Sequence, residues 1–168
     1  GSMELVELNH ETCVLSTAID ITERKQAQGD LDKSEHRWTS LVKTIPDFIA
    51  LFDEDGKYLF LNHYAKGYSE ADVVGRQNID YVIEEFRPEY LRKFQIAKQT
   101  GQTQYTEYQA YGDNGSKRYY DCYFTPIFEN SHFMYMLAVA RDITDRKAAE
   151  QALSFSQQQL RSMIHEAP

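Results

Sequence analysis

The sequence predicts an α+β domain that contains one antiparallel sheet and lies between two long helices. Three observations support this prediction. A segment near the start of the chain returns near its end, and apolar residues in both copies follow a helical spacing. Much of the sequence between the copies alternates between apolar and polar residues, with turn residues separating the alternating stretches. The pattern therefore places a β-rich domain between two related helices.

The repeated segment begins with the same three residues in both copies. Asp20-Ile21-Thr22 returns as Asp142-Ile143-Thr144, and the match continues without a gap to Pro46 and Pro168. Ten of the 27 aligned positions are identical, where chance would give about one or two. Such a repeat indicates an array of similar modules joined by similar connectors.

Both copies are predicted to be helices that carry a stripe of apolar and small residues. Thr22 and Thr144 are expected to cap the helices, and Pro46 and Pro168 to end them. The stripe fits an amphipathic helix that lies on its own sheet, and it fits a parallel coiled coil between two chains equally well. The stripe residues are Ala27, Leu31, Ser34, Trp38, Leu41 and Ile45 in the first copy and Ala149, Leu153, Ser156, Leu160, Met163 and Ala167 in the second.

Between the two helices, strand-like segments surround a helical region. The turn Asp53-Glu54-Asp55-Gly56 joins the first two strands into a hairpin. Upstream of the first helix, residues 4–8 and 12–19 are predicted to form another hairpin. The other predicted elements are strands over 48–52 and 58–61, a helix over 88–99, and strands over 103–111, 118–127 and 133–141.

Composition and charge exclude several classes of partner. The 18 basic and 26 acidic residues give a net charge of −8, which argues against nucleic acid or an anionic membrane as the main partner. No apolar run approaches the ~18 residues that a membrane-spanning helix needs. Cys13 and Cys122 lie far apart in apolar surroundings, which is typical of reduced thiols. We therefore expect a cytoplasmic protein without direct contact to nucleic acid or membrane.

The sequence gives little support for catalysis. It contains no glycine-rich phosphate-binding motif, no spacing typical of metal ligands and no nucleophile with a base partner. The hypothesis of a stand-alone enzyme rests only on the presence of polar residues such as His63 and His132. We expect neither enzymatic activity nor a metal site in this chain.

Short motifs between residues 46 and 147 follow one another in a characteristic order. They are Asp53-Glu54-Asp55-Gly56, Asn62, the stretch from Gly67 to Arg76, Asp113-Asn114-Gly115-Ser116, Thr125-Pro126-Ile127 and Asp142-Ile143-Thr144. In order and spacing this region closely resembles the PAS domain family. Only four residues separate Asn62 from Gly67, fewer than is usual in the family, so the first helix is expected to be shortened.

The resemblance implies a five-stranded antiparallel sheet with small helices on one face and a cavity between them. It also implies that the chain is divided into four segments. Residues 1–19 are expected to be the last strands of an upstream PAS module, 20–45 a connector helix, 46–141 a complete PAS domain, and 142–168 a connector helix that leads to a further module.

Strand alternation and the resemblance together predict which side chains line the cavity. The small side chains leave room for a small molecule, whereas the aromatic ones can fill the same space, so a packed core without a ligand is the alternative. Met134 is also expected to face inward. The expected ligand-binding residues are Tyr108, Ala110, Tyr120, Cys122, Phe124, Met136, Ala138 and Ala140.

The resemblance argues against two cofactors and leaves the ligand itself unknown. Light-sensing flavin PAS domains carry a cysteine where this chain has Asn78, so no flavin adduct is expected. Haem-binding relatives usually offer a histidine from the long helix, and residues 81–99 contain none.

The function that the resemblance implies is sensing or signal relay in a multidomain protein. The expected output is a sensor histidine kinase, and the partners are adjacent PAS and output domains in the same chain and, where the cavity is open, a small molecule. The alternative is a ligand-free dimerisation module in a cyclic-dinucleotide signalling protein. Asp20-Ile21-Thr22 and Asp142-Ile143-Thr144 are expected to transfer the signal. A parallel homodimer is expected to form through Leu31, Trp38, Leu41, Ile45, Leu153 and Leu160.

Overall fold

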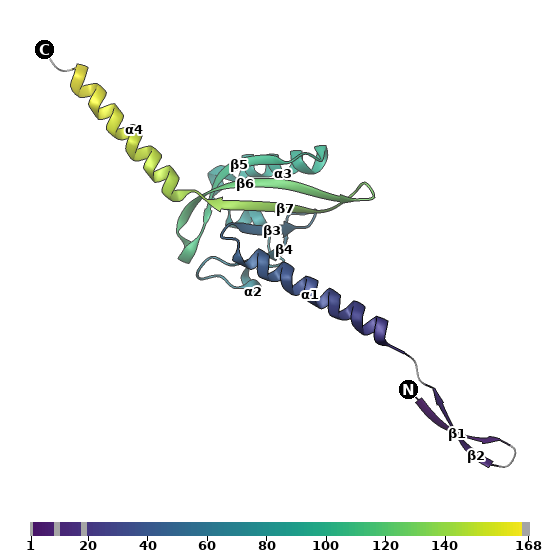
Figure 1. Ribbon diagram of the computed structural model, residues 1–168. Coiled ribbons are helices and arrows are strands. Elements are labelled where there is room, and N and C mark those ends of the chain that lie inside the picture. Colours follow the sequence, from purple (N-terminus) through teal and green to yellow (C-terminus); the bar gives the residue numbers. More distant parts are fainter. Residues whose placement is uncertain (1, 9–10, 18–19, 166–168) are drawn as a thin grey trace. The chain divides into compact units, whose positions relative to one another are not determined.

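A computed structural model of the chain describes residues 2–8, 11–17 and 20–165, and these divide into two compact units (Figure 1). The first unit comprises residues 1–41 and the second residues 42–168. The side chains described are those of residues 20–161 except Glu23 and Ala27. The predicted stripe positions Ala27, Met163 and Ala167, the cysteine Cys13 and the terminating Pro168 therefore lie outside the described side chains.

The first unit contains a β-hairpin and most of a long helix. Strands β1 (Ser2–Leu8) and β2 (Glu11–Thr17) pair antiparallel, which confirms the predicted upstream hairpin, although Ile19 at its expected end lies outside the described residues. Helix α1 (Thr22–Thr44) covers most of the segment that was predicted to be the first connector helix. Its last turn belongs to the second unit. Large apolar side chains of α1 are exposed to solvent: 53% of Leu31, 60% of Trp38 and 65% of Leu41.

The second unit is built on a five-stranded antiparallel sheet in the order β4-β3-β7-β6-β5. The first and last strands of this unit lie side by side because β3 pairs with β7, so that Phe48 lies opposite Ala140. The strands are β3 (Phe48–Phe52), β4 (Tyr58–Leu61), β5 (Gln104–Tyr111), β6 (Lys117–Glu129) and β7 (His132–Asp142). All five predicted strands are confirmed.

Short helices cover one face of this sheet (Figure 1). Helix α3 ends where Gly101 takes a left-handed backbone (φ 70°), a conformation that glycine adopts without strain. The region after β4 has no helix before Glu70, as expected from the short spacing between Asn62 and Gly67. The helices are α2 (Glu70–Val73), η1 (Asn78–Tyr81), η2 (Glu84–Phe86) and α3 (Arg87–Thr100), and η3 (Asp113–Gly115) forms the β5–β6 turn.

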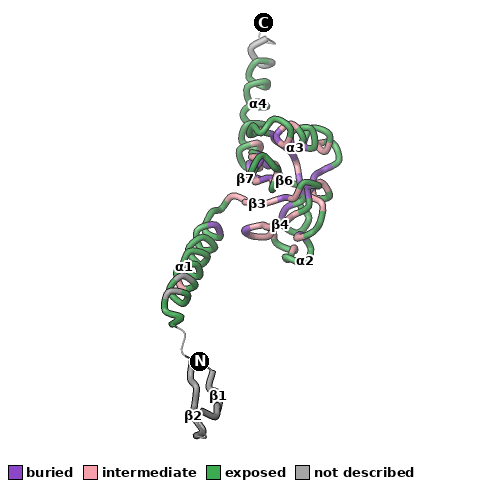
Figure 2. Tube along the Cα trace, turned by 90° about the vertical axis from the view of Figure 1, so that its right-hand side faces the viewer, coloured by how far each residue is buried: buried purple, intermediate pink, exposed green. Residues whose placement is uncertain are grey.

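The hydrophobic core lies between the sheet and the covering helices (Figure 2). Alternate residues of β6 and β7 are buried, because successive side chains of a strand point to opposite faces. Helix α4 (Thr144–His165) continues from β7, and most of its described residues beyond the start are exposed. Its Leu153 and Leu160 are 61% and 56% exposed.

The predicted inward position of Met134 is wrong. Its side chain is 45% exposed, whereas Phe133 packs against the core. The register between β6 and β7 shifts here, since Ile127 pairs with Tyr135 but Phe128 pairs with Phe133. Met134 is thus the extra residue of a β-bulge, and the bulge reverses the alternation that the sequence pattern assumed.

Candidate functional site

A cavity of about 90 Å³ lies between the inner face of the sheet and the covering helices. Its wall is apolar and aromatic. Tyr111 is the one exposed residue among the described residues of the wall, so the cavity reaches the surface beside it. The described residues that line it are Phe48, Ala50, Phe52, Tyr58, Leu61, Ala65, Tyr68, Val73, Tyr81, Tyr90, Tyr108, Ala110, Tyr111, Tyr120, Ala138 and Ala140.

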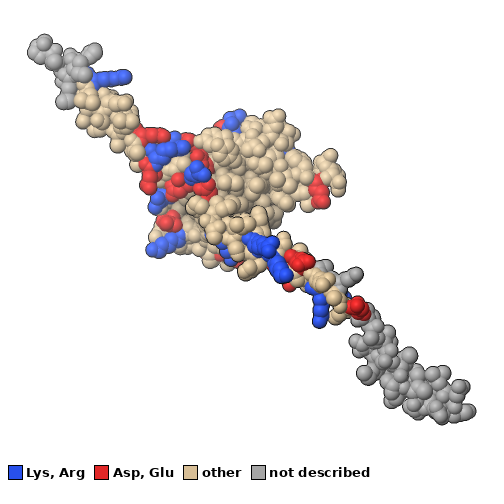
Figure 3. All heavy atoms as spheres, viewed as in Figure 1, with Lys and Arg blue, Asp and Glu red and all other residues tan. Residues whose placement is uncertain are grey.

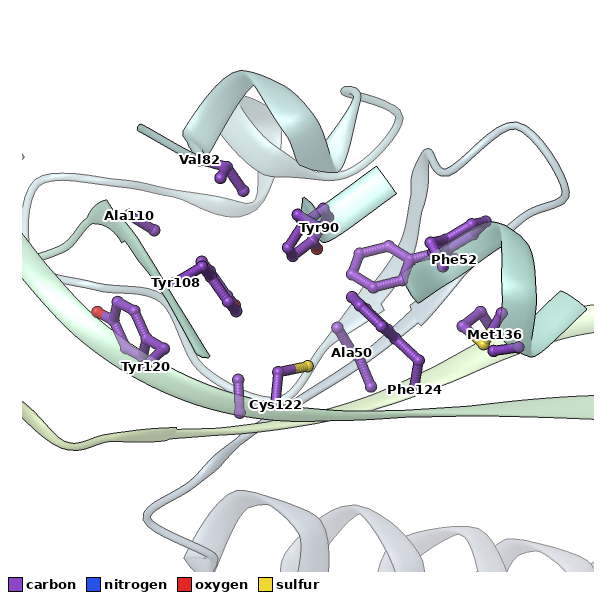
Figure 4. Close-up of a cluster of buried hydrophobic side chains, with 14 residues drawn as sticks. Ala50, Phe52, Val82, Tyr90, Tyr108, Ala110, Tyr120, Cys122, Phe124 and Met136 are labelled. Atoms are coloured by element: carbon purple, nitrogen blue, oxygen red, sulfur yellow. The ribbon is translucent and has the colours of Figure 1, made fainter. Parts of the chain in front are cut away.

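The structure brings together five of the eight residues that were expected to bind a ligand. Tyr108, Ala110, Tyr120, Ala138 and Ala140 all line the cavity. The other three, Cys122, Phe124 and Met136, are buried in the same hydrophobic cluster but do not line the cavity (Figure 4). Burial raises the pKa of the Cys122 thiol, so this residue is an unreactive part of the core.

Several residues that line the cavity were not predicted from the sequence. Phe48, Ala50 and Phe52 alternate along β3 and face the cavity, and the same strand alternation could have found them. Tyr68 lies at the end of a turn and Tyr81 is the last residue of η1, and neither segment is long enough for periodicity to predict the direction of a side chain. Their rings meet edge to face at 5.8 Å, and the Tyr81 hydroxyl donates a hydrogen bond to the carbonyl oxygen of Asp72.

Hydrogen bonds from backbone amides hold the cavity-lining segment around Ala65 and Tyr68 to the β5–β6 turn. The amide of Lys66 donates to the carboxylate of Asp113 (2.7 Å), and the amide of Asn114 donates to the carbonyl of Lys66 (2.6 Å). Gly67 has a φ of 97°, and a Cβ there would lie 3.4 Å from the Asn114 side chain. The left-handed backbone at Gly67, and not a lack of space, is therefore what favours glycine in this segment between Ala65 and Tyr68.

The start of α4 is bonded directly to β6. The amide of Ile143 donates to the carbonyl of Tyr119 (2.8 Å), and the amide of Tyr119 donates to the hydroxyl of Thr144 (2.9 Å). The predicted capping role of Thr144 is wrong, because its hydroxyl is occupied by the strand. Instead, the carbonyl of Ile143 accepts the first hydrogen bond of the helix, from the amide of Lys147. The Asp142 carboxylate accepts a hydrogen bond from the Thr144 amide (2.8 Å).

The first copy of the motif differs in its surroundings. The Asp20 carboxylate accepts a hydrogen bond from the Thr22 amide (2.9 Å), and the carbonyl of Ile21 accepts the first helical bond, from Lys25. The capping prediction for Thr22 is therefore also wrong, because Ile21 and not Thr22 precedes the first residue of the helix. Ile21 is 46% exposed, whereas its counterpart Ile143 in the second copy is buried.

Ion pairs add a second connection between the sheet and the first turn of α4. Lys147 and Arg146 reach Glu107 on β5 at 2.5 and 3.1 Å, and Arg146 also lies 3.9 Å from Asp121 on β6. Figure 3 shows acidic and basic residues gathered where α4 leaves the sheet. The hydrogen bond from Lys147, followed by that from Tyr105, lowers the pKa of Glu107, so the carboxylate is charged at neutral pH.

Two further properties concern only the described part of the chain. No described helix combines the length and apolar character needed to cross a membrane. Among the described side chains, no group of three or more His, Cys, Asp or Glu residues is arranged to hold a metal ion.

A family model described as the PAS fold matches residues 42–148, which is more than half of the chain. The chain belongs to the PAS family. The match spans the sheet, the cavity and the first turn of α4, so both structural features described above are parts of one PAS domain. No match is found among curated protein sequences.

Solved structures share the PAS fold at low sequence identity. The PAS domain of an HTR-like protein from Haloarcula marismortui is 22% identical, with a TM-score of 0.57 over 71% of this chain and 99% of that chain. A PAS domain from Colwellia psychrerythraea is 18% identical (TM-score 0.58; 66% and 97% covered). A sensory box histidine kinase/response regulator from Burkholderia thailandensis is 19% identical (TM-score 0.58; 75% and 98% covered).

Asn62 joins the beginning of the PAS domain to its sheet. Its side-chain oxygen accepts hydrogen bonds from the amides of Ile49 (2.8 Å) and His63 (3.1 Å). Its side-chain nitrogen donates to the carbonyls of Val42 (3.0 Å) and Asp47 (3.0 Å) and approaches that of Ile45 at 3.4 Å. One buried amide thus binds the last turn of α1 and the segment that follows it.

The beginning and the end of the PAS domain are also connected by an ion pair. The Arg141 guanidinium binds the Asp47 carboxylate through two nitrogens, at 3.1 and 2.8 Å. Asp47 directly precedes β3, and Arg141 is followed at once by the Asp142-Ile143-Thr144 junction. The segments that enter and leave the domain therefore meet at one end of the sheet.

Proposed function

We propose that this PAS domain is a non-catalytic sensory and relay module of a larger signal-transduction protein, with a histidine kinase as the output. The observation that supports the proposal most strongly is the short path from the cavity to α4. Ala138 and Ala140 line the cavity on β7, and the same strand reaches the α4 junction at Ile143 only three residues later.

The neighbouring strand offers a second short path. The ring of Tyr120 lines the cavity, while the backbone of the adjacent Tyr119 is bonded to both Ile143 and Thr144. A ligand that displaces the Tyr120 ring would therefore shift the strand to which the first turn of α4 is attached. Such a shift biases the helix because packed elements tend to move between discrete arrangements.

The incoming helix is attached to the same end of the sheet. Through Asn62 and through the Asp47–Arg141 ion pair, a movement that arrives along α1 reaches the residues beside the junction. This arrangement supports relay from an upstream module as well as sensing within the domain itself.

The sensing part of the proposal is tested by filling the cavity. Native mass spectrometry of the full chain with a library of small molecules should detect bound species. Replacing Ala138, which is buried between Ala50 and Phe124 in the sheet, with leucine should abolish their binding without unfolding the protein.

Ala97→Leu is the control, since Ala97 is buried in α3 away from the cavity. It should lower stability by about 1–3 kcal/mol through overpacking but leave binding intact. Binding that persists in Ala138→Leu would contradict a ligand site in this cavity.

A second candidate function, dimerisation, is favoured by the exposed apolar side chains of α1 and α4. Leu31, Trp38 and Leu41 on α1 and Leu153 and Leu160 on α4 are each more than half exposed, and their spacing is that of a coiled-coil seam. Burying these side chains in a parallel homodimer would remove apolar surface from water. Ile45, the remaining expected interface residue, is 38% exposed.

A further inference from the structure

The wall of the cavity carries no side chain that is charged at neutral pH among the residues the structure describes. It consists of alanine, valine, leucine, phenylalanine and tyrosine side chains. An ionised ligand would lose its hydration on entry and find no counter-charge, which strongly disfavours its binding. The cavity therefore selects against carboxylates, phosphates and ammonium groups.

Two tyrosine hydroxyls at the cavity lack a hydrogen-bond partner within the described part of the chain. Tyr90 on α3 and Tyr108 on β5 are only 3% and 9% exposed, and both line the cavity. No described residue forms a hydrogen bond with either hydroxyl. Among the described residues, every side-chain nitrogen or oxygen that is fully enclosed has a hydrogen-bond partner, so these two unpaired hydroxyls are not fully enclosed. Both hydroxyls therefore border open space, and the space that these side chains adjoin is the cavity.

The same two residues are hydrogen-bond donors at any physiological pH. Burial raises the pKa of Tyr90 and of Tyr108 well above the ordinary value of a phenol, so both hydroxyls keep their protons. A bound molecule that presents an acceptor to these hydroxyls would form hydrogen bonds with both donors inside an apolar cavity, where such bonds are stronger than in water.

The aromatic rings around the cavity are arranged to receive another ring. Tyr90 and Tyr108, both labelled in Figure 4, meet nearly perpendicular at 4.8 Å. Phe48 and Tyr120 do so at 5.8 Å. Edge-to-face contacts of this kind favour a further aromatic group. A dry cavity of about 150 Å³ is known to hold benzene, so the 90 Å³ here limits the buried part of a ligand to one ring or less.

We propose that the cavity binds an uncharged, single-ring aromatic compound whose hydrogen-bond acceptor faces the hydroxyls of Tyr90 and Tyr108. This inference rests on the sensory role proposed above and names the class of ligand that such a sensor would detect. A phenol or an aryl ketone has the required chemistry. The ring would enter beside Tyr111, the exposed residue of the wall.

Three probes with one ring and different substituents test the proposal. Phenol carries an acceptor, toluene has nearly the same shape without one, and benzoate is charged. Titration of the full chain, followed by NMR of the tyrosine rings, should give phenol a dissociation constant on the order of 1 mM or below. Phenol should bind about tenfold more tightly than toluene, and benzoate more weakly than either.

Removing the two hydroxyls should remove the selectivity. In the Tyr90→Phe/Tyr108→Phe variant, phenol should bind no more tightly than toluene, while toluene affinity stays within about twofold. Tyr111→Phe is the matched control, because Tyr111 lines the opening but is exposed, and it should leave the preference for phenol unchanged.

Equal binding of phenol and toluene by the unmodified chain, tighter binding of benzoate, or no binding of any ring would overturn the proposal. These outcomes are separable from a failure of the proposed function. If none of the rings binds but Ala138→Leu still changes the dynamics of α4, the relay role stands and only the ligand class is wrong.

Discussion

Replacing Asn62 with alanine should lower the free energy of unfolding of the PAS domain by about 3 kcal/mol. The Asn62 side chain is 5% exposed and bonds to the backbone of residues on both sides of the α1–β3 connection. Alanine would leave the Ile49 amide and the carbonyls of Val42 and Asp47 without this partner. Since domains of this size have ~5–15 kcal/mol of stability in total, the loss should be evident in urea denaturation followed by circular dichroism.

Asn62→Asp separates the two halves of this interaction. Aspartate keeps an acceptor for the Ile49 amide but places a buried carboxylate against the carbonyls of Val42 and Asp47. At neutral pH it should therefore be at least as destabilising as alanine. A loss below about 1 kcal/mol for both variants would contradict the assignment of Asn62 as the link between α1 and the sheet.

Replacing Leu31 and Leu41 with lysine should weaken a homodimer of the full chain at least 100-fold. Both side chains are more than half exposed on α1, and two lysines in each helix would place four like charges along a coiled-coil seam. Sedimentation velocity at tens of micromolar should show a dimer for the unmodified chain and a monomer for the variant. Circular dichroism should show that the sheet stays folded.

Gln26→Lys/Thr39→Lys is the matched control for that experiment. Both positions are exposed on α1 but lie off the stripe, so the same added charge should leave the dimer largely intact. A monomer for the unmodified chain at these concentrations would contradict the dimer model. A dimer that survives the Leu31 and Leu41 replacements would place the contact on another surface.

The strands were predictable because alternation and turn residues are local properties. Strands β3 and β4 have the predicted bounds, since each is short, apolar and flanked by polar turn residues. Alternation also identified Ala138 and Ala140 as inward-facing residues. It failed at Met134 because a bulge depends on the register with a partner strand, which a single strand's pattern does not contain.

The connections that matter for relay were harder to predict because they join residues far apart in sequence. Thr144 bonds to Tyr119, Lys147 pairs with Glu107, and Arg141 pairs with Asp47. Composition gives no sign of which charges meet. For Thr144, the local preference of threonine for helix caps pointed to a different role, and tertiary bonding to β6 overrode it.

The most direct test of relay is amide hydrogen exchange at the start of α4 when the cavity is filled. Ala138→Leu should change exchange at residues 143–148 by about fivefold or more, because β7 connects the cavity wall to Ile143 and Thr144. Thr144→Val, which removes the hydroxyl bound by the Tyr119 amide, should abolish most of this response when combined with Ala138→Leu. Thr22→Val, the equivalent change in the first copy, should preserve it. The four proteins compared are the unmodified chain, Ala138→Leu, and Ala138→Leu combined with either Thr144→Val or Thr22→Val. Exchange that changes only in the strands around the cavity, and is identical at residues 143–148 in all four, would contradict the relay account.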